Sequence, residues 1–352
     1  MVILLTPGAR AATEVLSFGD NPGNLRLFVH TPASLPPHPA LVVALHGCTQ
    51  TAADYGHTGW DQLADAHGFL VAYPQTATNN RCFEWFSSAQ QARDGDQVSS
   101  VLSAVSHLVT TAGVDPSRVF VTGLSAGAAM TNVLLAVAPD VFSRGQVVAG
   151  IPFRCTSSAL GASTCMLTPP YFSANYWGSL VPATQTPPRV QLWHGSLDFV
   201  VAPRNLEETL DQWTAVNGID QVAEVTMTRG DATGRAFHDD AGVVRVEAWL
   251  VSGMGHGTPI DEAAGCGEAQ SYVLDVGVCS ALEGARFFGL LVDAGDVDAG
   301  DADAGDVDAG DADAGDADAG DVDAGDADAG DVDAGDADAG DVDAGDADAG
   351  DV

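Results

Sequence analysis

The sequence has few basic residues and no long apolar segment. It holds 13 Lys and Arg against 49 Asp and Glu among 352 residues, a formal net charge of −36 at pH 7. Such a chain is a poor partner for nucleic acid, whose phosphates bind basic side chains. No apolar run approaches the roughly 20 residues that a membrane-spanning helix needs. We therefore expect neither nucleic acid nor a membrane among its partners.

The tail at residues 293–352 lacks aromatic and long aliphatic side chains. It consists of twelve copies of Asp-Ala-Gly-Asp-(Ala/Val) and carries 24 of the 49 acidic residues, so the other 292 residues have a net charge near −12. With so little to bury and so much charge, the tail is predicted to be a disordered acidic appendage. Its Asp-x-Asp-x-Gly spacing loosely resembles carboxylate-rich calcium repeats but lacks the Glu of a full calcium loop. Weak Ca²⁺ association is the alternative role.

The six cysteines lack the Cys-x-x-Cys pair that is typical of metal and redox sites. They are Cys48, Cys82, Cys155, Cys165, Cys266 and Cys279. An even set without that pair favours disulfides in an oxidising compartment, and short separations pair Cys155 with Cys165 and Cys266 with Cys279. The alternative is a set of buried free thiols in a cytosolic enzyme.

Residues 15–292 are long enough to form one α/β domain. Residues 1–14 are interpreted as a separate N-terminal segment. Its apolar run at 1–5 has no basic residues before it and is too short for an export signal. The segment is therefore either the remnant of such a signal or the result of a start placed inside a longer reading frame.

Apolar runs alternate with helical patterns along the domain. Strands are predicted at 24–30, 40–45, 69–73, 118–122, 146–151, 190–195 and 243–251. Helices are predicted around 60–67, from 98 to a stop at Gly113, and at 128–138, 205–216 and 280–291. Alternation of this kind indicates a mainly parallel sheet with helices on both faces.

The sequence Gly123-Leu124-Ser125-Ala126-Gly127 lies between a predicted strand and a predicted helix. In that context Gly-x-Ser-x-Gly is the nucleophile turn of the α/β-hydrolase fold. Asp198 and His256 follow later predicted strands, in the order of nucleophile, acid and histidine that is typical of this fold. Serine needs a base to remove its proton, and the acid orients that base. His46 and His194 also end strands, but their positions in the chain fit the base less well.

The loop after the strand at 40–45 reads His46-Gly47-Cys48. In α/β-hydrolases this loop and the residue after the nucleophile supply two backbone N–H groups to the oxyanion hole. We therefore predict that the amides of Cys48 and Ala126 form this hole.

Residues 155–188 contain no Asp, Glu, Lys or Arg. They hold Tyr171, Phe172, Tyr176 and Trp177, so the stretch is either a lid over the site or packed connecting structure. If the stretch is a lid, we predict that Tyr176 and Trp177 bind the substrate, because aromatic rings can hold an uncharged chain.

With these residues in view, the chain resembles the extracellular esterases of the polyhydroxybutyrate depolymerase group over residues 15–291. The similar blocks lie at 17–25, 45–52, 58–60, 82–86, 115–119, 121–127, 193–198, 212–213 and 255–259. The resemblance implies an α/β-hydrolase that uses Ser125, Asp198 and His256, with no metal or other cofactor. It also implies secretion and a third disulfide between Cys48 and Cys82.

The implied substrates are a polyhydroxyalkanoate or other polyester or, as the second possibility, feruloyl or acetyl esters of plant cell-wall polysaccharide. Two departures affect substrate fit: Ala128 stands where the group usually has a second glycine, and residues 93–97 depart from its Arg-Gly-x-Gly-Glu pattern. The alternative from another class is a non-catalytic acidic surface protein that responds to calcium, and the intact triad argues against it.

Overall fold

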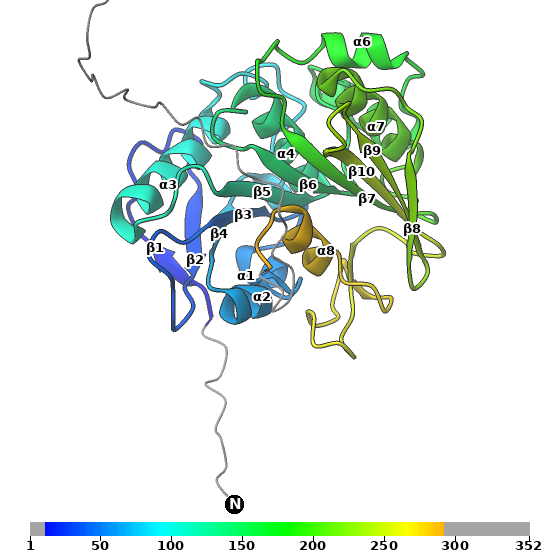
Figure 1. Ribbon diagram of the computed structural model, residues 1–352. Helices are drawn as coiled ribbons and strands as arrows, with labels where there is room; N and C mark the ends of the chain where they lie inside the picture. The colour runs from blue at the N-terminus through cyan, green and yellow to red at the C-terminus, as the bar shows by residue number, and fades with distance from the viewer. Residues whose placement is uncertain (1–10, 292–352) are drawn as a thin grey trace, which may run out of the picture. The chain divides into compact units, whose positions relative to one another are not determined.

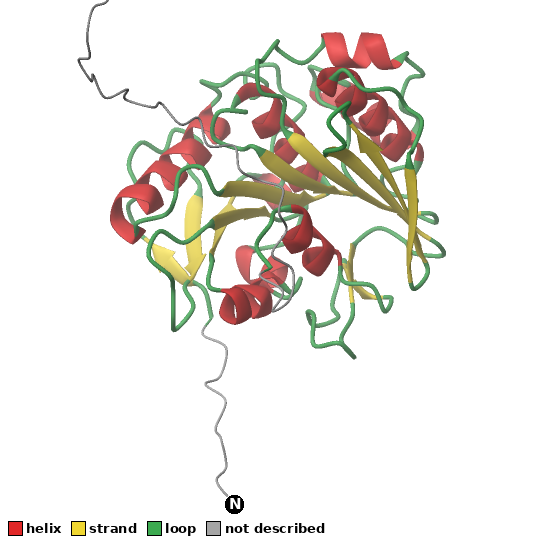
Figure 2. Ribbon diagram, in the orientation of Figure 1, coloured by secondary structure: helices red, strands yellow, loops and turns green. Residues whose placement is uncertain are grey.

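The centre of the molecule is one ten-stranded sheet, seen in a computed structural model that describes residues 11–291 (Figures 1 and 2). The strand order across the sheet is β1-β2-β4-β3-β5-β6-β7-β10-β9-β8. The strands are β1 (Thr13–Val15), β2 (Arg26–His30), β3 (Leu41–Leu45), β4 (Leu70–Gln75), β5 (Val119–Leu124), β6 (Arg144–Val148), β7 (Arg189–Gly195), β8 (Val225–Arg229), β9 (Ala232–His238) and β10 (Val244–Val251).

The middle of this sheet is parallel, and its two edges are antiparallel. The strands β4, β3, β5, β6, β7 and β10 pair in parallel, while β1 and β2 extend one edge and β9 and β8 the other. The predicted mainly parallel sheet is confirmed. The hairpin of β8 and β9 was not predicted, because β8 is largely exposed and so has no apolar run to mark it.

Helices cover both faces of the sheet, as predicted (Figure 1). One face carries α3 (Asp96–Ala112), α4 (Ala126–Val137) and α7 (Arg204–Asn217), and the other carries α1 (Ala52–Gly56), α2 (Trp60–His67) and α8 (Ser280–Phe287). Strand β3 shows the reason: Leu41, Val43 and Leu45 belong to the first core, whereas Val42 and Ala44 belong to the second. Successive side chains of a strand point to opposite faces, so an unbroken apolar run suits a sheet covered on both sides.

Shorter elements connect these layers. Helices α5 (Ala159–Leu167) and α6 (Ala174–Ser179) lie between β6 and β7 in the chain, and a 3₁₀ turn spans Asn79–Arg81. A separate two-stranded sheet joins β11 (Thr258–Ile260) to β12 (Val273–Asp275).

All three predicted disulfides are present. Cys48 is bonded to Cys82, Cys155 to Cys165 and Cys266 to Cys279. Each bond includes at least one cysteine that lies outside the helices and strands.

The central sheet begins slightly earlier in the chain than the predicted domain does. Strand β1 starts at Thr13 and pairs with β2, so at least two residues of the predicted segment 1–14 belong to the sheet. The predicted boundary at 292 and the tail at 293–352, with its expected disorder and Ca²⁺ association, lie outside the described residues. Within residues 11–291, no helix is both long and apolar enough to cross a membrane.

Candidate active site

Ser125 occupies a strained turn between β5 and α4. Its backbone has φ 56° and ψ −117°, a conformation that costs free energy for any residue other than glycine and that is common at active sites. The turn is very tight: a Cβ atom on Gly127 would lie 2.2 Å from the carbonyl oxygen of Leu45, and one on Gly123 would lie 2.5 Å from the backbone of Gly127. The glycines of the motif are therefore required by close backbone approach.

The loop after β3 packs against this turn. A Cβ atom on Gly47 would lie 3.5 Å from the Cβ atom of Ser125, so the two backbones are neighbours. The amide of Gly47 donates to Oε1 of Gln50 at 2.9 Å, and the Arg81 guanidinium donates to the carbonyl of Thr49. Together with the Cys48–Cys82 disulfide, these bonds hold the loop in place.

The two amides predicted to form the oxyanion hole belong to Cys48, in the loop after β3, and Ala126, at the start of α4. Cys48 lines the cavity that contains Ser125, and Ala126 is the first residue of α4, where the N–H groups of a helix have no intrahelical acceptor. Within residues 11–291, neither amide donates a hydrogen bond to a protein acceptor. Both are thus free to donate to a bound group.

Asp198 and His256 form a buried hydrogen-bonded pair. Nδ1 of His256 lies 2.7 Å from Oδ2 of Asp198, and the amides of Val200 and Val201 donate to Oδ1 at 2.9 and 2.8 Å. Burial by itself raises the pKa of Asp198, but hydrogen bonds from His194 and His256 outweigh it and hold that pKa well below its usual range. The carboxylate is therefore ionised at neutral pH and orients His256.

His46 and His194, the other two histidines that end strands, make hydrogen bonds to backbone carbonyl groups instead. Nδ1 of His46 lies 2.8 Å from the carbonyl oxygen of Gly47, and burial lowers the pKa of His46 to about 4. Nε2 of His194 lies 2.9 Å from the carbonyl oxygen of Val201 and 3.4 Å from Asp198. Neither lines the cavity that contains Ser125, whereas His256 does. Sequence reasoning did not foresee that His194 supports the acid.

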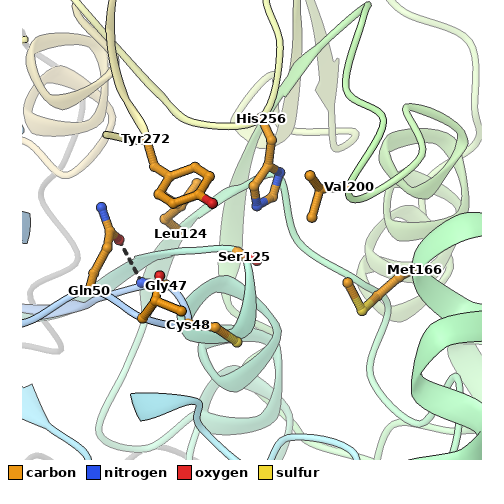
Figure 3. A pocket seen from close by; sticks show the side chains of 10 residues that line it. Gly47, Cys48, Gln50, Leu124, Ser125, Met166, Val200, His256 and Tyr272 are labelled. Carbon is orange, nitrogen blue, oxygen red and sulfur yellow. Dashed lines mark hydrogen bonds between the residues drawn. The ribbon is translucent and has the colours of Figure 1, made fainter. Parts of the chain in front are cut away.

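The cavity at Ser125 has a volume of about 120 Å³ (Figure 3). It is lined by Gly47, Cys48, Thr49, Gln50, Leu124, Ser125, Met166, Val200, His256 and Tyr272. An engineered cavity of roughly 150 Å³ is known to hold benzene, so this one suits a small organic group. Six lining side chains were not predicted as site residues: Thr49, Gln50, Leu124, Met166, Val200 and Tyr272.

Tyr272 and Gln50 also border a second cavity of about 350 Å³. Its walls are nearly all polar: Thr49, Gln50, Asp54, Gln270, Ser271 and Tyr272. Tyr272 has φ 64°, a left-handed conformation that is rare for a bulky residue. Across residues 11–291, no cluster of three or more His, Cys, Asp or Glu could hold a metal ion.

Of the two predicted substrate contacts, that of Trp177 needs correction, whereas that of Tyr176 stays a prediction. Trp177 is 0% exposed, and its indole N–H donates to the buried Glu208 at 2.5 Å. Tyr176 is partly exposed beside Phe172 on the molecular surface, and neither residue lines the cavity. The uncharged stretch is therefore packed connecting structure at this point, because α6 packs against α7 and buries the Trp177 ring.

Exposed apolar side chains instead occur on the loop that carries Asp198. Leu197, Phe199 and Val200, here called the acid-loop patch, are all exposed, and Phe199 is 82% exposed. Val200 also lines the cavity, so the patch borders its mouth. Exposed apolar groups that gather in this way often mark a binding surface.

The chain resembles known esterases in sequence and structure. The family profile described as Esterase PHB depolymerase matches residues 25–235. The chain is 42% identical over 292 residues to poly(3-hydroxyalkanoate) depolymerase C of Paucimonas lemoignei, covering 80% of this chain and 70% of that protein. It is 37% identical over 259 residues to an acetylxylan esterase of Coprinopsis cinerea, covering 70% and 69% respectively.

Two further relatives agree with these. The chain is 34% identical to feruloyl esterase B of Talaromyces stipitatus, covering 74% of this chain and 75% of that protein. The solved acetyl xylan esterase of Aspergillus awamori aligns with a TM-score of 0.69 and 28% identity, covering 80% of this chain and all of that one. The chain therefore belongs to the esterase PHB depolymerase family, whose members are carboxylic ester hydrolases with the α/β-hydrolase fold.

Proposed function

We propose that Ser125, His256 and Asp198 hydrolyse carboxylic esters through an acyl-enzyme. The observation that carries the proposal is the 2.7 Å bond between His256 and the ionised Asp198, with Ser125 and His256 lining one cavity. This bond leaves Nε2 of His256 available for the proton of the Ser125 hydroxyl. The hydroxyl oxygen attacks the ester carbonyl carbon, and the amides of Cys48 and Ala126 donate to the oxyanion.

The second half of the cycle uses the same groups. His256 gives its proton to the departing alcohol, which leaves the acyl group on Ser125. A water molecule then attacks the acyl carbon while His256 takes its proton, and the free acid departs as Ser125 regains its hydrogen. Asp198 stays ionised and stabilises the imidazolium that forms twice in each cycle.

The lead substrate is a polyester of hydroxyalkanoate type. The acid-loop patch supports this proposal, since it presents apolar surface at the mouth of a small cavity. Burying one large aromatic ring contributes on the order of 1 to 3 kcal/mol to the binding of an uncharged polymer. The match with the poly(3-hydroxyalkanoate) depolymerase of Paucimonas lemoignei agrees with this choice.

The second candidate is an acylated polysaccharide. The polar cavity beside Tyr272 favours it, because hydroxyl-rich sugars bind through hydrogen bonds to such side chains. A short acyl group, such as acetyl, fits about 120 Å³ better than the larger feruloyl group.

Secretion is part of the proposal. Three disulfides fasten the described domain, and disulfides persist in oxidising compartments. Separation of cells from culture medium, followed by thiol quantification on the protein from each fraction, tests this. Protein in the medium without free thiols is expected, and intracellular protein with free thiols would contradict secretion.

Turnover of p-nitrophenyl acetate and butyrate tests the reaction, with Ser125→Ala as the matched control. Polyhydroxybutyrate particles, acetylated xylan and methyl ferulate, assayed in parallel, then rank the substrates. Hydrolysis of acetylated xylan without release of hydroxybutyrate would favour the second candidate. No hydrolysis of any ester would contradict the proposed reaction.

A further inference from the structure

The cavity at Ser125 has an apolar side and a polar side. Figure 3 shows Met166 and Val200 on one side of Ser125, and Gln50 and Tyr272 on the other. On the polar side the cavity shares Thr49, Gln50 and Tyr272 with the second cavity, so a long polar group has room to extend there. An ester has an acyl part and an alcohol part, and the apolar side suits an alkyl acyl group.

Met166 is a lining residue that has no part in the proposed chemistry. Among the lining residues it is the one that α5 contributes, and it is partly buried against the core. Thioether side chains are flexible and adapt to irregular gaps. The position of α5 therefore decides how much space remains on the apolar side.

Helix α5 has little packing of its own to hold it. Cys165 is its one buried residue, its N-cap Ser158 makes no side-chain capping bond, and Leu160 is 92% exposed. A nine-residue helix is marginal in water without tertiary support. The support must come from bonds near its C-terminal end.

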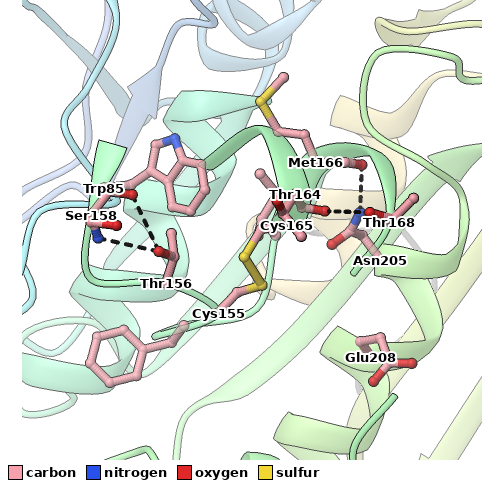
Figure 4. The surroundings of a disulfide bond; sticks show 12 residues. Trp85, Cys155, Thr156, Ser158, Thr164, Cys165, Met166, Thr168, Asn205 and Glu208 are labelled. Carbon is pink, nitrogen blue, oxygen red and sulfur yellow. Dashed lines mark hydrogen bonds between the residues drawn. A yellow bond between two sulfur atoms is a disulfide. The ribbon is translucent and has the colours of Figure 1, made fainter. Parts of the chain in front are cut away.

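Two sets of bonds meet at that end (Figure 4). The Cys155–Cys165 disulfide joins α5 to the segment that follows β6. The carbonyl of Met166 accepts hydrogen bonds from the amide of Ala202 at 2.7 Å and from Nδ2 of the buried Asn205 at 3.1 Å. Ala202 follows Val201, whose amide binds Asp198, so these bonds fix Met166 relative to the acid loop.

We propose that Met166 limits the size of the acyl group that Ser125 accepts, and that the Cys155–Cys165 disulfide holds Met166 in that place. This inference rests on the proposed ester hydrolysis at the same site. Shortening Met166 opens the apolar side, and a bulkier residue closes it. Release of the disulfide frees α5 from the segment that follows β6. The freed helix leaves more space on the apolar side, so the effect has the same direction as shortening Met166.

The test compares kcat/KM for p-nitrophenyl acetate, butyrate and octanoate. Met166→Ala raises the octanoate-to-acetate ratio by about tenfold or more, since a methylene in an apolar pocket is worth a factor of that size. Met166→Phe lowers the butyrate-to-acetate ratio by about the same factor. The matched control is Leu160→Ala, a similar truncation on the exposed face of α5, which keeps both ratios at the wild-type values.

The variant Cys155→Ser/Cys165→Ser tests the disulfide. It raises the octanoate-to-acetate ratio, by less than Met166→Ala does, because the hydrogen bonds of the Met166 carbonyl remain. Circular dichroism establishes that each variant is folded, and the two Met166 variants decide the size limit if the cysteine variant does not fold.

Three outcomes overturn the inference in distinguishable ways. If Met166→Ala behaves like Leu160→Ala while acetate is still hydrolysed, Met166 does not set the size limit. If the cysteine variant is folded and keeps the wild-type ratios, the disulfide does not hold Met166 in place. Failure of the wild-type protein to hydrolyse any of the three esters overturns the proposed function, and this inference with it.

Discussion

The Nδ1 atom of His256 lies 2.7 Å from the Oδ2 atom of Asp198, although 58 residues separate them in the chain. Strands β7 and β10 explain the contact, since they pair in parallel up to Gly195 and Val251. The loops that follow these strands therefore start side by side, and the amide of Leu197 donates to the carbonyl of Met254 at 2.9 Å. Parallel strands gather their loops at one edge of the sheet, where open α/β folds place their sites.

The first prediction concerns the nucleophile. Ser125→Ala leaves the fold intact and lowers kcat for p-nitrophenyl butyrate by several orders of magnitude, as loss of a triad nucleophile does in other enzymes. A fluorophosphonate probe labels Ser125 in the wild-type protein and no residue of the variant. Labelling of a different serine would show that the assignment is wrong.

The second prediction concerns the tight turn. Gly127→Ala abolishes most ester hydrolysis and lowers the melting temperature, because the new Cβ atom would lie 2.2 Å from the Leu45 carbonyl oxygen. The added methyl displaces the loop that carries Cys48. Gly56→Ala is the matched control, since its Cβ atom meets its nearest neighbour, a carboxylate oxygen of Asp61, at 3.6 Å. Equal melting temperatures for both variants would contradict the close contact.

The third prediction concerns pH. Burial lowers the pKa of His46 to about 4 from 6.5, so the unfolded chain takes up this proton at a higher pH than the folded chain does. His46 does not lower the unfolding free energy above pH 6.5. As the pH falls from 6.5 towards 4, it lowers the unfolding free energy by up to about 3 kcal/mol. His46→Asn therefore weakens the pH dependence of the unfolding free energy across that window. Urea unfolding at pH 7.5, 6, 5 and 4 measures it, and an unchanged slope would rule out a neutral buried His46.

The fourth prediction concerns the acid-loop patch. Phe199→Ser lowers the hydrolysis of polyhydroxybutyrate particles by about tenfold or more and keeps p-nitrophenyl butyrate turnover within a few-fold, because a small ester needs only the cavity. Leu16→Ser is the control: Leu16 is 90% exposed but follows the edge strand β1, whereas the patch follows β7, and five strands lie between β1 and β7 in the sheet. If both variants lose the same activity on particles, the patch has no special role.

The fifth prediction concerns the tail. Deletion of residues 293–352 leaves kcat and KM for small esters unchanged, because every residue that lines the cavity lies between 47 and 272. Titration of the full chain and the truncated chain with Ca²⁺, followed by calorimetry, tests weak association with the repeats. Loss of esterase activity on truncation would show that the tail contributes to the site.

Much of the molecule follows from local sequence. The apolar run of β3 predicts a strand buried on both sides, and Gly113, at φ 68°, ends α3 where its helical spacing stops. The serine turn, the acid and the histidine could be predicted because each follows a strand in the order typical of the fold. The two disulfides between cysteines close in the sequence could also be predicted, since few residues lie between the partners.

Only the tertiary structure decided which side chains meet at the cavity. Trp177 stands in an uncharged aromatic stretch, and the same residues suit either a lid or a packed connection until α6 is placed on α7 and Glu208. Met166, Val200 and Tyr272 carry no local pattern that distinguishes them from other apolar residues. Their place at the cavity arises from contacts between segments that are distant in the chain, such as the bonds of Met166 to Ala202 and Asn205, and such contacts leave no periodic signal in the sequence.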